Sequence, residues 1–171
     1  MEFAPLTYDK NRSYTLSVIA AVGPHYELGI KNSLLWHIRE DLQHFKAITT
    51  GHTVIMGSNT FVSLGSKPLP NRENIVLYPD TNPLDKVLQR IAPGVEAFIM
   101  GGAMVYAQTV PVADKLYITH VNAPLPESGV DVWFPEIDKT IWEETSREDF
   151  ACGATFPYPF SFVVYERREP R

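Results

Sequence analysis

The segment FIMGGAMVY, residues 98–106, joins a short apolar run to a helical pattern through two adjacent glycines. The segment VIMGSNTF, residues 54–61, repeats this order with Gly57 at the junction. Because glycine has no side chain, the phosphate of a ligand can approach the backbone N–H groups at such a turn. Neither segment matches the GxGxxG fingerprint of dinucleotide sites. The glycines could therefore also serve only to allow tight strand-to-helix turns.

Short apolar runs and helical patterns alternate along the first two thirds of the chain. The apolar runs are 16–22, 53–56, 74–77 and 97–100, and the helical candidates are 40–49, 59–64, 84–90 and 103–110. Runs with little polar alternation are typical of strands covered on both faces. The repeated order predicts a mostly parallel α/β sheet with helices on both faces. After Lys115 three strand-like stretches follow without helices, which predicts an antiparallel C-terminal edge.

The composition fits one globular domain. Of the 171 residues, 44% are hydrophobic and 20% are charged, and the chain has no repeat or linker. We expect the domain at 14–171, after a partly ordered N-terminal extension at 1–13. With a net charge of -5 the chain has no large basic surface for nucleic acid, so we expect no nucleic-acid partner. No apolar run approaches the ~20 residues of a membrane span, so we expect no membrane partner. The single Cys152 and a polar start favour a reducing cytoplasm.

The stretch WHIREDLQHFKAI, residues 36–48, places a carboxylate on an apolar helix face. Asp41, Phe45 and Ile48 fall at i, i+4 and i+7 and so share one face. Such a face suits a flat, nitrogen-rich heterocycle that donates two parallel hydrogen bonds to the carboxylate. The alternative is that Asp41 faces water and only complements the helix dipole. His37 and His44 have no metal-type partner at a suitable spacing, so we expect them at the surface and predict no metal site.

These motifs resemble the dihydrofolate reductase family, in order from 17 to 167. The most specific piece is LGIKNSLLWHIREDLQHFK, residues 28–46, where the family has a glycine-containing mobile loop, a tryptophan, the pterin-binding carboxylate and an aromatic residue. The segment 53–77 is similar to the family's cofactor-binding helix and PLP-x-R-x-N-I motif. The segment 98–106, followed by LYITHV, is similar to its Gly-Gly junction and a later strand. The resemblance implies the family's fold and the reduction of dihydrofolate to tetrahydrofolate by hydride transfer from NADPH, for one-carbon metabolism.

On the substrate side the resemblance implies four catalytic residues. Asp41 would bind N3 and the 2-amino group of the pterin, Trp36 and Thr119 would support it through hydrogen bonds, and Leu34 would cover the nicotinamide. Arg72 would pair with the α-carboxylate of the substrate's glutamate. The remaining substrate contacts would be Ile19, Ala21, Leu42, Phe45, Leu64, Leu69 and Met100. Asp41 would raise the basicity of the pterin N5 through space, while a water delivers the proton.

On the cofactor side the resemblance implies dinucleotide contacts at both glycine junctions and a cis peptide between Gly101 and Gly102. The expected contacts are Ala21, Leu28, Gly29, Gly57, Ser58, Asn59, Thr60, Leu77, Tyr78, Met100, Gly101, Gly102, Ala103, Met104 and Tyr106.

The residues at the positions where the family binds the cofactor phosphates depart from the family pattern. Many relatives carry arginine where Ser58 and Met104 stand, and serine-type residues where Tyr78 and Pro79 stand. Proline has no N–H and tyrosine is bulky. We therefore expect NADPH as the cofactor but a smaller discrimination against NADH than in arginine-bearing relatives.

Two other functions fit parts of the pattern. The pyrimidine reductase of riboflavin synthesis shares the sheet and the Gly-Gly junction but lacks the Trp-to-Asp helix motif. A non-catalytic folate- or dinucleotide-binding homologue would explain the missing arginines, but Asp41, Phe45, Arg72 and Thr119 are all retained. The expected partners are therefore small molecules, dihydrofolate and antifolate inhibitors, bound by a monomer.

Overall fold

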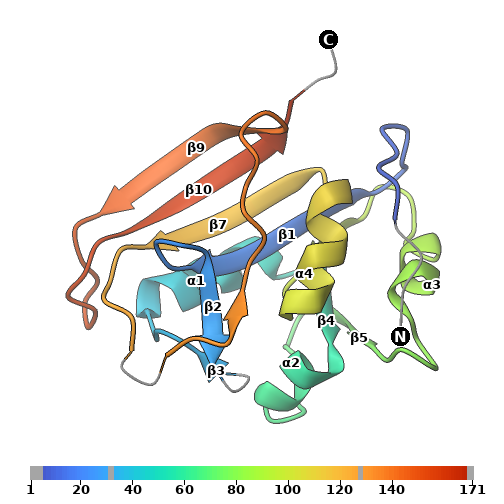
Figure 1. Cartoon of the computed structure of the whole chain (residues 1–171). Helices are drawn as coiled ribbons and strands as arrows, with labels where there is room; N and C mark the ends of the chain where they lie inside the picture. The colour runs from blue at the N-terminus through green and yellow to red at the C-terminus, as the bar shows by residue number, and fades with distance from the viewer. Residues whose placement is uncertain (1–5, 31–32, 127–128, 169–171) are drawn as a thin grey trace.

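A seven-stranded sheet forms the centre of the molecule in the computed structural model, which describes residues 6–30, 33–126 and 129–168, with the backbone alone at 30, 33 and 34 (Figure 1). In spatial order its strands are β5 (Glu73–Leu77), β4 (Thr53–Gly57), β6 (Glu96–Ile99), β1 (Thr15–Val22), β7 (Lys115–Val121), β10 (Phe160–Arg167) and β9 (Trp142–Phe150). The first five are parallel, and β10 is antiparallel to both of its neighbours. The predicted mostly parallel sheet with an antiparallel C-terminal edge is confirmed.

Helices cover both faces of this sheet. They are α1 (Arg39–Thr49), α2 (Ser58–Ser63), α3 (Leu84–Gln89) and α4 (Ala103–Thr109), with a 3-10 turn at η1 (Val110–Val112). Successive side chains of β4 point to opposite faces. Val54 and Met56 pack with the Phe45 of α1, whereas Ile55 packs with the Leu84 of α3. In Figure 1, α4 crosses in front of the sheet and α1 lies behind it. None of the helices that the structure describes is long and apolar enough to cross a membrane.

A second, smaller sheet stands where the family resemblance implies only a mobile loop. It contains β3 (Ser33–Leu34), β2 (Glu27–Ile30) and β8 (Val132–Trp133), in that order, and all pairs are antiparallel. Strands of two to four residues are too short to show a period in their hydrophobic pattern. Glu27 pairs with Trp133, which lies far from it in the sequence. Local sequence patterns cannot reveal such a pairing.

The described part of the expected N-terminal extension packs against the domain. Leu6 and Tyr8 contact the core on the α3/α4 face. The Arg12 guanidinium donates to the carbonyl oxygen of Val112 at 2.6 Å and to the Asp114 carboxylate at 3.2 Å. The Asp114 carboxylate also accepts the N–H of Leu16 at 2.8 Å, so this ion pair joins the extension to the first strand of the sheet.

Candidate active site

Two adjoining cavities open at the carboxyl ends of the parallel strands, where ligands of open α/β sheets bind. The acid cavity, of about 170 Å³, contains Asp41 and Trp36. The glycine cavity, of about 550 Å³, is bordered by Gly29, Gly101 and Gly102. Five residues line both cavities: Ala21, Leu28, Leu64, Met100 and Tyr106. A ligand in one cavity therefore shares a wall with a ligand in the other.

Asp41 is the only carboxylate among the described residues that line the acid cavity. It lies in the first turn of α1, and its Oδ1 accepts a hydrogen bond of 2.5 Å from the Thr119 hydroxyl. Burial raises the pKa of Asp41, and the Thr119 bond and the nearby His44 oppose this shift. Phe45 lines the same cavity, and Ile48 packs in the same apolar cluster as Phe45. The predicted helix face is thus present, and Asp41 does not simply face water.

Two neighbouring strands hold the walls of the acid cavity in place. Thr119 on β7 is buried and pairs in register with Ala21 on β1. The Tyr106 hydroxyl donates a hydrogen bond of 2.8 Å to the carbonyl oxygen of Ile19. Burial, together with the charge of Asp41, raises the pKa of Tyr106, so the phenol stays protonated and remains a donor. Of the expected substrate contacts, Ile19, Ala21, Leu42, Phe45, Leu64 and Met100 line this cavity.

The two glycine junctions pack directly against each other beside the glycine cavity. The Gly101–Gly102 peptide is cis, as the resemblance implies. The Gly57 N–H donates to the carbonyl oxygen of Gly101 at 2.8 Å. Gly101 has φ +133, and a Cβ atom at this position would lie 3.1 Å from the Thr60 hydroxyl oxygen. Of the expected cofactor contacts, Ala21, Leu28, Gly29, Asn59, Thr60, Met100, Gly101, Gly102, Ala103 and Tyr106 line the cavity.

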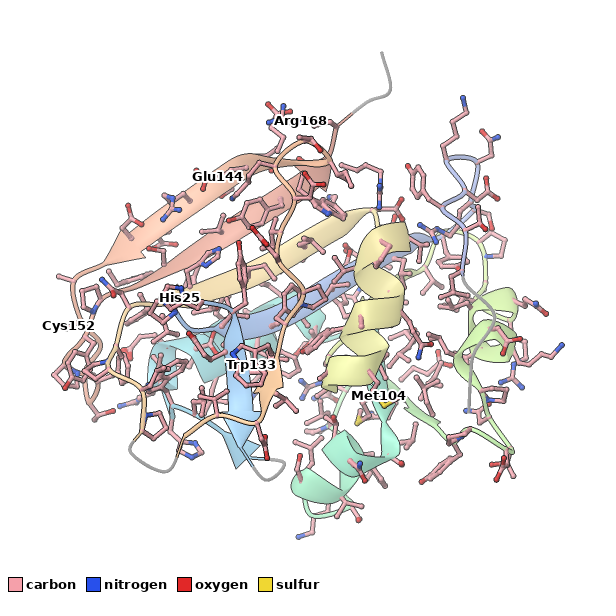
Figure 2. All side chains as sticks on the ribbon, viewed as in Figure 1. His25, Met104, Trp133, Glu144, Cys152 and Arg168 are labelled. Atoms are coloured by element: carbon pink, nitrogen blue, oxygen red, sulfur yellow. The ribbon has the colours of Figure 1, made fainter. Side chains whose placement is uncertain are left out.

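The remaining expected cofactor residues lie outside both cavities. Ser58 is the first residue of α2, directly after Gly57. Leu77 is buried in the core on the α3/α4 face. Tyr78 and Met104 are 43% and 68% exposed. Figure 2 shows Met104 at the end of α4 that faces α2.

Three expected substrate-side residues are not among the described residues that line the acid cavity. Leu69 packs in the same cluster as Phe45. The Arg72 guanidinium lies 5.8 Å from the Phe45 ring centroid and donates to Thr49 Oγ1 at 3.1 Å, so it stands close to the acid cavity without lining it. The backbone of Leu34 forms part of β3, but its side chain lies outside the described residues.

Some lining residues are not among those expected from the sequence. His37, Val62, Ser63 and Val132 line the glycine cavity. Ser63 follows Thr60 by three positions in α2, so helical periodicity could have found it. Val132 comes from β8 and carries no local signal. His37 is exposed, as expected, although it borders the cavity.

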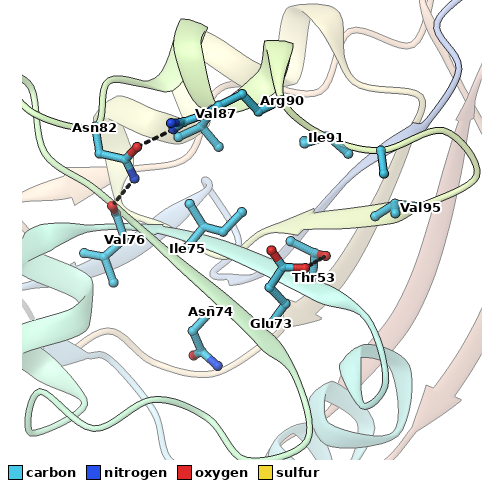
Figure 3. Close-up of a pocket in the computed structure, with 11 residues that line it drawn as sticks. Thr53, Glu73, Asn74, Ile75, Val76, Asn82, Val87, Arg90, Ile91 and Val95 are labelled. Carbon is cyan, nitrogen blue, oxygen red and sulfur yellow. Dashed lines mark hydrogen bonds between the residues drawn. The ribbon is translucent and has the colours of Figure 1, made fainter.

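A third cavity, of about 420 Å³, lies between β5 and α3 and contains none of the expected site residues (Figure 3). Its polar side chains bond to one another or to the backbone. Thr53 Oγ1 donates to Glu73 at 3.4 Å, and Asn82 accepts from Arg90 and donates to the Val76 carbonyl oxygen. Within the described part of the chain, no group of His, Cys, Asp and Glu side chains could hold a metal ion.

Comparison with known proteins agrees with this geometry. The family model described as dihydrofolate reductase matches residues 15–167. The chain is 38% identical over 163 residues to a dihydrofolate reductase of Bacillus subtilis (strain 168), covering 90% of this chain and 95% of that one. It is 41% identical over 160 residues to a dihydrofolate reductase of Neisseria gonorrhoeae, covering 88% and 96%.

A solved structure shows the same fold. It is a dihydrofolate reductase from Enterococcus faecalis complexed with NADP(H) and RAB-propyl, with a TM-score of 0.81 and 28% identity over 91% of this chain and 97% of that one. Together with the family match and the position of Asp41 in the acid cavity, these findings settle the classification. The chain belongs to the dihydrofolate reductase family.

Proposed function

We propose that the protein reduces 7,8-dihydrofolate to 5,6,7,8-tetrahydrofolate with NADPH, and so supplies one-carbon metabolism. The single observation that carries the proposal is the Asp41 carboxylate, held by Thr119 in an apolar cavity that shares five residues with the glycine cavity. A redox enzyme must bring two ring systems into contact, and a shared wall does this. The family match and the relative solved with NADP(H) support the same conclusion.

The acid cavity would bind the pterin ring. The Asp41 carboxylate would accept parallel hydrogen bonds from N3 and the 2-amino group, and the Thr119 bond keeps the carboxylate in one orientation. Ile19, Ala21 and Phe45 offer apolar surface to a flat ring, and Trp36 would support the pterin through a hydrogen bond. Antifolate inhibitors, which resemble the substrate ring, would occupy the same cavity.

The glycine cavity fits NADPH. Because a Cβ atom at Gly101 would meet the Thr60 hydroxyl oxygen, the glycine lets the two junctions beside this cavity pack closely. Asn59, Thr60 and Ser63 offer polar side chains, and none of the described lining residues is a carboxylate that would repel phosphate. When bound, NADPH supplies the hydride. Ser58, Tyr78 and Met104 would face its adenosine half without a cation.

Asp41 would also assist protonation of the substrate. Its negative charge, in a partly desolvated cavity, favours a proton on the pterin N5 through space, so the carboxylate need not touch that atom. A water molecule would deliver the proton. Leu34 would cover the nicotinamide, and Arg72 would bind the α-carboxylate of the glutamate tail from its place beside Phe45.

The proposal includes a monomeric enzyme in a reducing cytoplasm. The reducing compartment is supported by the single cysteine of the sequence, Cys152, which is free and exposed in the turn between β9 and β10 (Figure 2). The molar mass in solution, measured by light scattering during gel filtration, tests the monomer.

The experiment is the fall in absorbance of the reduced nicotinamide when purified protein meets dihydrofolate, run in parallel with NADPH and NADH. We expect rapid loss with NADPH that depends on dihydrofolate. Binding of folate without any loss of absorbance would instead identify a non-catalytic homologue. If folate does not bind and the absorbance does not fall, the result would favour the pyrimidine reductase of riboflavin synthesis. An assay with the ribosylated pyrimidine substrate would then test that function.

A further inference from the structure

Glu27 is a buried carboxylate that the proposed chemistry does not use. It begins β2 and is 2% exposed, and it is the one charged residue in the buried class among those that the structure describes. A buried carboxylate costs free energy unless hydrogen bonds compensate the loss of water. An apolar residue could occupy this strand position without the free-energy cost of desolvating a charge.

The Glu27 carboxylate closes the turn between β1 and β2. The His25 N–H lies 2.8 Å from Oε1 and 3.1 Å from Oε2, and so it donates to the carboxylate two positions along the chain. The Gly23 N–H donates to the Glu27 carbonyl oxygen at 3.0 Å, and the Tyr26 N–H donates to the Gly23 carbonyl oxygen at 3.1 Å. The carboxylate is thus held in one place by the turn that it closes.

The same carboxylate and the indole of Trp36 border one space over Gly23. A Cβ atom at Gly23 would lie 2.7 Å from Cη2 of Trp36 and 3.0 Å from Oε2 of Glu27. Gly23 is not among the glycines with positive φ, so its backbone does not require glycine. The missing side chain instead leaves space that the indole and the carboxylate both border. The rim of an aromatic ring carries partial positive charge, which a neighbouring carboxylate attracts.

The indole atom that borders this space shows which half of the ring lies over Gly23. Cη2 belongs to the benzene half of Trp36, away from the pyrrole half that carries the N–H. Trp36 is only partly buried, and it lines the acid cavity together with Asp41. A ring held at its benzene half presents its N–H in a constant direction, as hydrogen bonding to a bound pterin requires.

We infer that Glu27 and Gly23 are positioning residues, which hold the indole of Trp36 against the acid cavity and so set the affinity for the pterin. The inference rests on the proposed function, in which Trp36 supports the substrate. Neither residue touches the substrate. Both act through the indole, so their removal disturbs the pterin site more than the cofactor site.

The test uses Gly23→Ala and Glu27→Gln, with the exposed Glu136→Gln as the matched control. The first readout is the indole N–H resonance of Trp36 in the protein alone, assigned by its loss in Trp36→Phe. We expect it to move in both variants but not in the control, while the resonance of the buried Trp142 stays in place. The second readout is Kd, measured separately for folate and NADPH. We expect the Kd of folate to rise about tenfold or more, the loss typical of a misplaced binding group, and that of NADPH to stay within about twofold.

Three outcomes would overturn the inference. One is a Trp36 resonance that does not move in Gly23→Ala. This variant keeps every hydrogen-bonding group of the turn, so it decides the matter if Glu27→Gln does not fold. Another is a shifted resonance with an unchanged Kd for folate. The third is an equal loss of folate and NADPH affinity with a lower Tm, which would indicate a structural role alone. Should the unsubstituted protein bind no folate, the proposed function fails, whereas the resonance still tests the positioning.

Discussion

Asp41 combines a functional requirement with a cost to stability. Burial raises the pKa of its carboxyl group, so the charged form is less favourable in the folded protein than in the unfolded chain. The group therefore supports folding when it is protonated, and this contribution is lost as the pH rises through the folded-state pKa. In the proposed function, this unfavourable charge lies where the pterin needs an acceptor.

Asp41→Asn removes that charge at every pH and keeps the shape. We expect turnover to fall at least about a hundredfold, because the electrostatic support of the substrate is lost. The Tm at pH 7 should be unchanged or higher than in the unsubstituted protein, and this difference should shrink towards pH 4. Thermal unfolding across this range, with the exposed Asp80→Asn as the control, measures it. A marked fall in Tm at pH 7 would mean that the carboxylate stabilises the fold.

Ser58 offers a way to test the choice of cofactor. It begins α2 directly after Gly57, where many relatives carry arginine, and the nearby Tyr78 and Met104 are exposed and uncharged. We expect Ser58→Arg to raise the ratio of kcat/KM with NADPH to kcat/KM with NADH by about tenfold, because a guanidinium binds the 2′-phosphate and NADH has none.

The control for Ser58→Arg is Gln89→Arg, which adds the same charge at the end of α3. An equal gain in the control would show that only the overall field matters, although salt screens such distant charges. An unchanged ratio in Ser58→Arg would place the 2′-phosphate elsewhere.

At the scale of elements, the junction between β6 and α4 contains two glycines that tolerate change differently. Gly101 has φ +133 and too little space beside Thr60, whereas Gly102 has φ -89 and its nearest atom would lie 3.4 Å from an added Cβ. We expect Gly101→Ala to lower the free energy of unfolding by about 2 kcal/mol and Gly102→Ala by clearly less. Unfolding in urea compares the two. Equal losses would mean that space, and not the positive φ, limits both positions.

The central sheet could be predicted because each strand carries its own signal. The run 53–56 coincides with β4, Thr53–Gly57, because its residues are covered on both faces and show no polar alternation. Helical periodicity likewise predicted the face that joins Asp41 to Phe45. The small sheet could not be predicted, because Glu27 meets Trp133 only after the whole chain has folded. For the same reason Val132 was missed. The space that Glu27 and Trp36 share over Gly23 was missed because no local pattern shows which side chains border a glycine.

The whole molecule depends on contacts between distant parts of the chain as well. Arg12, in the segment expected to be an extension, is bound by the carbonyl oxygen of Val112 and by Asp114, and its guanidinium stands 5.3 Å from the Tyr14 ring centroid. A single arginine among polar residues gives no sign in the sequence of a partner a hundred positions away. Only the assembled fold shows how this segment is held.

The five residues that line both cavities lead to a prediction for the whole site. A ligand that contacts Leu28, Met100 and Tyr106 orders side chains that the second ligand would otherwise have to order itself. We expect NADP⁺ to lower the Kd of folate by about threefold or more, and folate to lower the Kd of NADP⁺ by the same factor, as linkage requires. Isothermal titration of each ligand, with and without the other, measures both.

Adenosine 2′,5′-bisphosphate is the control ligand for this coupling. It carries the adenosine end of the cofactor but no nicotinamide, so it should bind without reaching the shared wall and should leave the Kd of folate unchanged. Coupling by the control as strong as that by NADP⁺ would show that the two sites communicate through the protein's overall stability or charge. Coupling by NADP⁺ alone would locate it at the wall formed by Leu28, Met100 and Tyr106, because only the nicotinamide half of the ligand differs between the two experiments.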